Sequence, residues 1–131
     1  MKRLCFVLAA VALLVCGTLA VRSAEALKVL GQLNPSATTA TTLYTVPGGT
    51  STVISTITVA NQAGTSGTFR VAIRPGGASL TASQYIAYDV TIPANDTIVL
   101  TLGITLATTD VVTVYASSAS MSFSAFGSEI S

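Results

Sequence analysis

Few residues of this 131-residue chain are of a type that does catalytic or metal chemistry. Histidine is absent, and both cysteines, Cys5 and Cys16, lie within the first 26 residues. Ser-His and Cys-His catalytic pairs and His- or thiolate-bound metals are therefore excluded from residues 27–131. A Ser-Lys pair would need Lys28, which stands at the very start of that segment. We predict a non-enzymatic protein with no catalytic residue, no metal site and no cofactor.

Three aspartates are the candidates for acid–base chemistry or for a hard cation. Paired carboxylates can act as general acid and base, and Asp89, Asp96 and Asp110 are the available groups. Asp96 and Asp110 each stand at the start of an apolar segment, where aspartate commonly accepts hydrogen bonds from turn N–H groups. The sequence contains no D-x-D-x-D-G motif, the spacing that would indicate a calcium-binding loop. We therefore predict turn residues at Asp96 and Asp110.

Two arginines and two tyrosines form a possible interface. Arg70 and Arg74 are four positions apart, so an extended strand would place both on one face. Next to Tyr85 or Tyr88 they could stack, and Asp89 could pair with either. One interpretation of these residues is a solvated strand face with weak ion pairs. The other is an intersubunit contact, because Arg and Tyr are enriched in interface cores.

The tyrosines also suggest a sugar-binding patch, which would make the protein an exported adhesin or a carbohydrate-binding module. The chain has no tryptophan, and no acidic cluster accompanies the tyrosines. Packing at the edge of a core or in an interface is therefore the favoured role for aromatic side chains with a polar tip. The four residues concerned are Tyr44, Tyr85, Tyr88 and Tyr115.

Residues 1–26 read as a leader. Two basic residues are followed by an apolar run at 4–21 and by the triplet Ala24-Glu25-Ala26. This order is typical of a secretory signal peptide cleaved after Ala26. The alternative is a retained membrane helix, since the run is at the lower limit for crossing a bilayer. If the leader is used, we predict an extracellular or cell-surface protein, which meets the membrane only through the leader and only where the leader is not cleaved.

The charge of residues 27–131 excludes nucleic acid as a partner. Binding to phosphates needs clustered cations, and this segment has only a few scattered ones. Thr and Ser are abundant instead, which predicts an uncharged, hydroxyl-bearing surface that is easier to desolvate against a partner than one rich in Lys or Glu. The charged residues of the segment are Lys28, Arg70, Arg74, Asp89, Asp96, Asp110 and Glu129.

The elements that must position these residues are short strands. Apolar residues alternate with polar ones, and Pro, Gly, Asn and Asp interrupt the alternation. Strict alternation places Val53, Ser55, Ile57 and Val59 on one face, and Ile98, Leu100 and Leu102 on another. Gly103 marks a possible bulge or bend. The predicted strands are 28–33, 41–46, 52–60, 69–74, 84–92, 97–102, 111–116 and 119–126.

Further inward-facing sets complete the predicted core. Each is an alternating series on one predicted strand, with the intervening residues turned outward. We predict an all-β fold, an antiparallel two-sheet β-sandwich of about eight strands with jelly-roll or immunoglobulin-like connections. The domains are the leader at 1–26 and the sandwich at 27–131. The inward sets are Phe69, Val71 and Ile73; Tyr85, Ala87 and Asp89 or the opposite set Ile86, Tyr88 and Val90; Val112 and Val114; and Met121 and Phe123.

Several short segments are distributed along residues 28–131: KVLGQ (28–32), TLYTVP (42–47), TFRVAIRP (68–75), TDVVTVYA (109–116) and MSF (121–123). In these segments the chain resembles small structural proteins of tailed bacteriophages. The resemblance implies a virion component, either a head decoration or a tail-associated protein. The leader departs from that pattern. Either the domain is reused as an exported surface or filament subunit, or the first 26 residues serve another purpose or result from an over-extended start.

The function predicted from these features is that of a structural subunit. Its partners would be copies of itself or other structural subunits, in a virion or in an extracellular filament or surface layer. The apolar residues at the start of the domain suggest an extended arm that adds as a strand to a neighbour's sheet edge. The residues of this possible arm are Leu27, Val29, Leu30 and Leu33.

Overall fold

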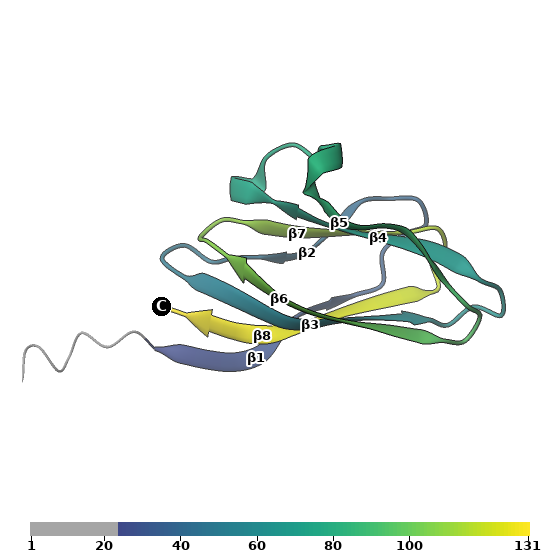
Figure 1. The fold of residues 1–131 in the computed structure, drawn as a ribbon, viewed down its shortest axis with the longest axis horizontal. Helices are drawn as coiled ribbons and strands as arrows, with labels where there is room; N and C mark the ends of the chain where they lie inside the picture. Colours follow the sequence, from purple (N-terminus) through teal and green to yellow (C-terminus); the bar gives the residue numbers. More distant parts are fainter. Residues whose placement is uncertain (1–23) are drawn as a thin grey trace, which may run out of the picture.

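The alternating apolar residues fold into eight strands. The computed structural model describes residues 24–131, with two short 3-10 turns between the fourth and fifth strands (Figure 1). The elements are β1 (Glu25–Leu33), β2 (Thr41–Thr45), β3 (Ser51–Asn61), β4 (Gly67–Arg74), η1 (Pro75–Gly77), η2 (Ala82–Gln84), β5 (Tyr85–Ile92), β6 (Thr97–Leu106), β7 (Val111–Ala116) and β8 (Met121–Ile130).

The strands form two four-stranded antiparallel sheets, in the orders β1-β8-β3-β6 and β2-β7-β4-β5. The pairs β1–β8, β2–β7, β3–β6 and β4–β5 are nested like the arms of one long hairpin, and the pairs β3–β8 and β4–β7 close the two sheets. This eight-stranded order is that of a jelly roll. The predicted β-sandwich is confirmed, and the strand order decides between the two predicted connection types.

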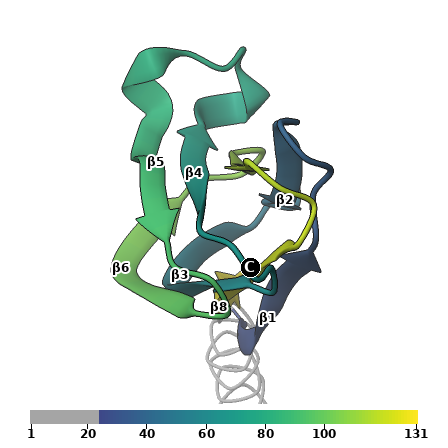
Figure 2. The same ribbon diagram turned by 90° about the vertical axis from the view of Figure 1, so that its right-hand side faces the viewer.

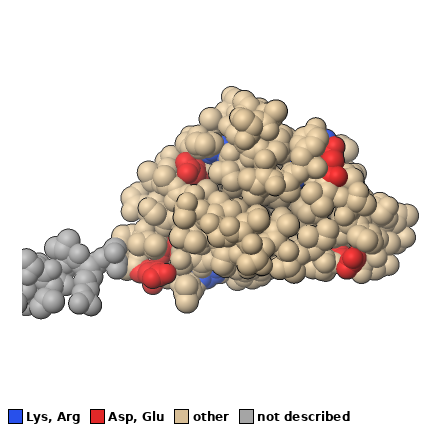
Figure 3. Space-filling model, in the orientation of Figure 1, with Lys and Arg blue, Asp and Glu red and all other residues tan. Residues whose placement is uncertain are grey.

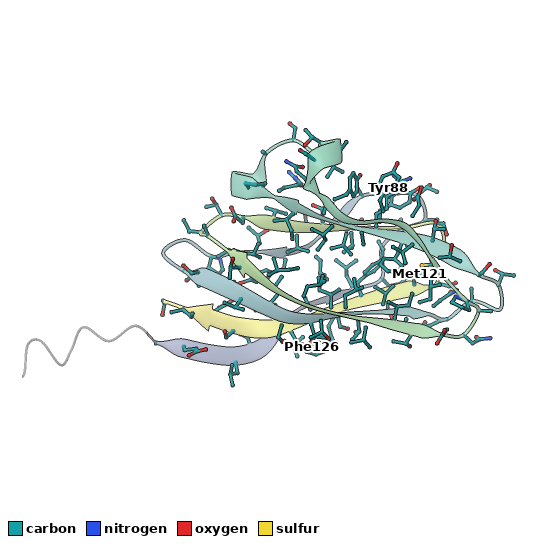
Figure 4. All side chains as sticks on the ribbon, viewed as in Figure 1. Tyr88, Met121 and Phe126 are labelled. Atoms are coloured by element: carbon teal, nitrogen blue, oxygen red, sulfur yellow. The ribbon has the colours of Figure 1, made fainter. Side chains whose placement is uncertain are left out.

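The two sheets lie face to face, with β1 and β2 along one side of the sandwich and β5 and β6 along the other (Figure 2). Their inner faces supply a core of fully buried side chains, which include Phe69, Phe123, Ile57 and Met121. The Phe69 and Phe123 rings meet edge to face with centroids 6.1 Å apart. Met121 lies between the layers in Figure 4. The predicted inward positions at 69, 71, 112, 114, 121 and 123 are thereby confirmed.

A bulge in β3 makes the strict alternation predicted there wrong. The register of β3 against both neighbours shifts between Ile54 and Thr56, so Ser55 is an extra residue. Thr52 and Ile54 are buried on one side of the shift, and Ile57 and Val59 on the other. Because a one-residue insertion reverses the faces, Val53 lies on the face opposite to Ile57.

The same effect removes Leu102 from the predicted core. Gly103 adopts a positive φ of 61°, which a residue without a Cβ accepts readily. The bulge turns Leu102 outward, where 48% of its surface is exposed, and Ile104 and Leu106 take the inward positions. The bulge predicted at Gly103 is confirmed, whereas the inward position predicted for Leu102 is wrong.

In β5, neither predicted alternation holds throughout. Ala87 and Val90 both pack against the core, although they are three positions apart. The spacing is possible because Asp89 has a φ of 47° and the register shifts between Phe69 and Val71 of the partner strand. Tyr88 and Asp89 are therefore displaced to the outer face of the sheet.

The two ends of the described chain are joined by main-chain hydrogen bonds. The N–H of Ala24 donates to the carbonyl of Ser131, and the N–H of Ser131 donates back to Ala24. β1 thus begins at Glu25, ahead of the domain boundary predicted at residue 27. The predicted leader lies outside the described residues up to position 23. Within 24–131, no helix is long and apolar enough to cross a membrane.

Candidate functional site: the two outer faces of the sandwich

Arg70 is the centre of an aromatic cluster on the outer face of the β2-β7-β4-β5 sheet. Its guanidinium carbon lies 4.2 Å from the ring centroid of Tyr88 and 4.4 Å from that of Tyr115. Both distances are within the range of a cation–π contact. Tyr85 meets Tyr88 edge to face, with centroids 4.9 Å apart. Tyr88 projects outward from this face in Figure 4.

Asp89 completes the contacts of the Arg70 guanidinium. Nε of Arg70 donates to Oδ1 of Asp89 at 2.6 Å, and Nη2 donates to Oδ2 at 3.3 Å. The hydrogen bond to Asp89 raises the pKa of Arg70 further above its already high value. With two rings and a carboxylate around it, this guanidinium fastens the bulge of β5 to β4 and β7 and is not free to bind an external anion.

Arg74 does not join this cluster. Its Nε and Nη2 donate to the carbonyls of Ala78 and Gly77 at 2.7 and 2.9 Å, and its Nη1 donates to Thr113 at 3.4 Å. Arg74 therefore holds the β4–β5 connection against the sheet. Of the four residues predicted as a possible interface, the structure brings together Arg70, Tyr85 and Tyr88.

The β4–β5 connection and the tyrosines enclose an open hollow of about 570 Å³. Its lining is mainly apolar and carries no formal charge. Tyr88 is 57% exposed and supplies most of the accessible aromatic surface. The hollow is lined by Leu80, Thr81, Ala82, Tyr85 and Tyr88.

Tyr44 packs in the core, as the favoured role predicted for the tyrosines has it, and it is no part of a surface patch. Its side chain is buried between the sheets, and its hydroxyl bonds to Thr52 at 2.8 Å and donates to Glu129 at 2.7 Å. Glu129 also pairs with Lys28 at 2.7 Å. Burial raises the pKa of Tyr44 to about 12, whereas the hydrogen bond from Lys28, followed by that from Tyr44, lowers the pKa of Glu129.

The remaining aspartates act in turns. Asp110 accepts hydrogen bonds from the N–H groups of Gly76 and Ala107, and Asp96 accepts one from Thr97. Both predicted turn roles are confirmed. Each carboxylate has its own separate partners. Among residues 24–131, no group of three His, Cys, Asp or Glu side chains is placed to hold a metal ion.

The outer face of the β1-β8-β3-β6 sheet has no charged residue in its central part. Cross-strand partners share a face, and the outward residues form three rows across the sheet. Figure 3 shows the sandwich from the side, and there the charged side chains are isolated spots. The rows are Gln32, Ser124, Thr58 and Val99; Val29, Phe126, Thr56 and Thr101; and Leu27, Ser128, Val53 and Thr105.

This hydroxyl and apolar face was not singled out from the sequence. Phe126, which projects from it in Figure 4, stands at the end of a predicted strand, and the bulge at Ser55 conceals which residues of β3 point outward. A usable signal was present: the residues that alternate with the buried series of β3 and β8 include no charge over their central length.

The four residues of the possible arm lie in β1, which pairs with β8 of the same chain. Leu30 and Leu33 pack against the core, while Leu27 and Val29 are 83% and 50% exposed. Gly31 approaches β2 so closely that a Cβ there would overlap the Leu43 carbonyl oxygen. The second half of β1 therefore packs against its own sandwich, whereas the outward side chains of the first half are exposed to solvent.

Comparison of the chain with protein-family models, with curated proteins and with solved structures found no match.

Proposed function

We propose that this chain is a non-enzymatic structural subunit that assembles with copies of itself or decorates a larger particle. The candidate settings are a virion and an extracellular filament or surface layer. The observation that carries the proposal is the outer face of the β1-β8-β3-β6 sheet, whose three central rows contain Thr, Ser, Gln, Val, Leu and Phe but no charged residue.

The physical reason is the low cost of covering such a face. Removing a charged side chain from water costs several kcal/mol unless it gains a partner, whereas hydroxyl groups can exchange water for hydrogen bonds with a docking surface. Strand pairing also makes the face rigid, so little conformational entropy is lost on docking. A monomer that had to remain solitary would be expected to carry charges on such a surface.

The charged side chains give independent support. Lys28 pairs with Glu129 and Arg70 with Asp89, while Arg74 and Asp110 bond to main-chain groups. These charges stabilise the fold itself and leave the broad face neutral. Jelly-roll domains serve many functions, so the fold alone does not carry the proposal.

The test is to place one charge in the middle of this face. Thr58→Lys puts an ammonium in a central row, opposite Ser124 and Val99. We expect the wild-type protein to form higher oligomers or particles at high concentration in sedimentation velocity and electron microscopy, and Thr58→Lys to lose these and fall back to a dimer or a monomer. Ser79→Lys is the matched control, because it adds the same charge to an exposed position of the β4–β5 connection.

Both variants should unfold within about 0.5 kcal/mol of the wild type, because neither changes the core. Higher oligomers or particles that survive in Thr58→Lys would remove this face from the assembly. A wild-type protein that stays monomeric at millimolar concentration and binds no particle would refute the proposed function.

A carbohydrate-binding module or adhesin is the second candidate, favoured by the uncharged hollow beside Tyr85 and Tyr88. One ring face of Tyr88 is already covered by Arg70, which reduces the aromatic surface available for stacking. Binding to a glycan array that disappears in Tyr88→Ala, with unchanged sedimentation, would favour this function over assembly.

A further inference from the structure

The first half of β1 presents unpaired main-chain groups along its free edge. β1 is the outermost strand of its sheet and pairs with β8 on one side. Ala24 and Ser131 exchange both of their main-chain hydrogen bonds. Because bonded and non-bonded positions alternate along an antiparallel pair, Ala26 and Lys28 also direct their main-chain groups toward β8. The N–H and C=O groups of Glu25, Leu27 and Val29 therefore point away from the sheet.

Among the four edge strands of the described sandwich, this stretch is the one best suited to pairing. β5 and β6 are interrupted by the positive-φ residues Asp89 and Gly103, and β2 is short and has its own register shift. Bulges of this kind are a common protection of sheet edges. The bulge of β1 comes after Val29, so Glu25–Val29 remains regular.

The side chains of this stretch also lack the usual protection. Leu27 is 83% exposed and Val29 50%, and both lie on the outer face, where Glu25 is the one charged residue of the stretch. The nearest cation, Lys28, lies on the opposite side of the strand and pairs with Glu129 of its own sheet. An exposed, apolar and regular edge is a template for another strand.

We propose that β1 pairs antiparallel with β1 of a second copy around a two-fold axis at Leu27, which joins the two sheets into one continuous sheet. This inference rests on the proposed function and adds to its docking face a second contact, between the β1 edges of two copies of the chain. Leu27 faces Leu27 of the second copy, and Glu25 faces Val29. Each outward residue of both strands then donates and accepts one main-chain hydrogen bond.

Charge and hydrogen bonding select this register. An axis at Lys28 would set the two lysines directly opposite each other, and an axis at Glu25 would do the same for the two glutamates. Like charges in such pairs are destabilising. An axis at Ala26 would leave Val29 without a bonded partner among the regular residues. The axis at Leu27 uses all three outward residues and places four apolar side chains together on the outer face.

The pairing includes Glu25, which lies within the predicted leader at 1–26, so it depends on where the leader is cleaved. Cleavage after Ala26 would leave Leu27 at the N-terminus and remove part of the paired stretch. The inference therefore requires a chain that keeps residues 24–26, and the intact mass of the purified protein checks this. Cleavage after Ala26 in the assembled protein would overturn the inference.

A cysteine at the axis tests the register directly. Leu27→Cys is made in the full chain with Cys5→Ser and Cys16→Ser, so that no other thiol is present. Bonded antiparallel partners have Cα atoms about 5.5 Å apart, which a disulfide can bridge. We expect a covalent dimer under mild oxidation. Val99→Cys on β6, which is 58% exposed, is the matched control and should remain a monomer on a denaturing gel.

A second pair of variants tests the main-chain contact. Leu27→Pro removes an N–H that points away from β8, so β1 keeps its own pairing while the central bonds of the dimer are lost. We expect the dissociation constant of the dimer, measured by sedimentation, to increase at least tenfold. The circular-dichroism spectrum should be unchanged. Leu27→Thr keeps the N–H and should weaken the dimer by a few-fold.

The outcomes separate this inference from the proposed function. Oligomers that persist in Leu27→Pro, or that give no Leu27→Cys disulfide, would overturn the β1 contact and leave the proposed assembly standing. A chain that is monomeric in every variant would overturn both. If Leu27→Pro fails to fold, the cysteine cross-link still decides.

Discussion

Lys28, Tyr44, Thr52 and Glu129 come from four different strands and meet at the end of the sandwich where the chain termini lie. Tyr44 and Thr52 are buried there, and Glu129 accepts from both Tyr44 and Lys28. The group ties β1, β2 and β3 to β8, so it links the two sheets. Elsewhere Arg70, Arg74 and Asp110 are bound within the fold in the same manner. At the level of single residues, these charges are bound within the fold, while the central rows of the outer face of the β1-β8-β3-β6 sheet carry none.

Glu129 should make the stability of the protein decrease at acidic pH. Its pKa is lowered in the folded state, chiefly by Lys28, so its contribution is complete above the ordinary carboxyl pKa of 4.5 and is lost as the pH falls through the folded-state pKa. Glu129→Gln should remove that part of the acid sensitivity. Urea midpoints measured from pH 7 to pH 3 should fall less steeply in the variant. Parallel curves for the two proteins would contradict the linkage.

At the level of the strands, bulges determine which side chains face the core and which face outward. The extra residue in β3 returns its apolar set to the core after Ser55, Gly103 turns Leu102 outward, and Asp89 moves Tyr88 to the outer face. These bulges also increase the local twist, which suits a sheet that curls into a jelly roll. Close approaches accompany them: a Cβ at Gly127, beside the β3 bulge, would overlap the carbonyl oxygen of Val53.

Gly127→Ala should therefore destabilise the protein. Gly127 has no positive φ to explain its identity, so the cost comes from space alone, and overpacking of this kind costs about 1–3 kcal/mol. Gly48→Ala is the matched control, since a Cβ there meets nothing within 4 Å. Denaturant unfolding of both variants provides the measurement. Equal stabilities would mean that β3 and β8 can separate without cost at this point.

At the scale of the whole molecule, the nested pairing brings the two ends of the domain together. Ala24 and Ser131 are hydrogen-bonded, and β1 and β8 leave the same end of the sandwich side by side (Figure 1). The contacts that close the fold are thus far apart in the sequence, which favours slow folding. The same geometry keeps β1 beside its own chain, where it can offer an edge to a second copy.

A circular permutant should separate two ways of assembling. Joining Ser131 to Ala24 by a short linker and opening the exposed loop at Gly64 should preserve the fold, because the joined ends are adjacent and the opened loop is at the surface. Tied at both ends, β1 cannot leave its sheet, but its edge remains free. Sedimentation should show that dimers persist. Loss of dimers in a folded permutant would favour an exchanged arm over edge pairing.

The strands, most of the core and the turn roles of Asp96 and Asp110 could be predicted from the sequence. Period-two alternation is a local property, and the inward residues Val71, Val112 and Phe123 follow from it directly. The absence of histidine, and of cysteine beyond the first residues, likewise restricts the chemistry without any structure.

The strand order, the bulges in β3 and β5 and the composition of the outer faces could not be predicted without the folded structure. Alternation is the same for every order of strands, so a jelly roll and an immunoglobulin-like sandwich give one pattern. One extra residue in a strand, such as Ser55, reverses the alternation after it. The position of that extra residue depends on pairing with strands far along the chain. The Arg70 cluster and the free edge of β1 follow from that pairing, because neighbours in space, rather than in sequence, determine what remains exposed.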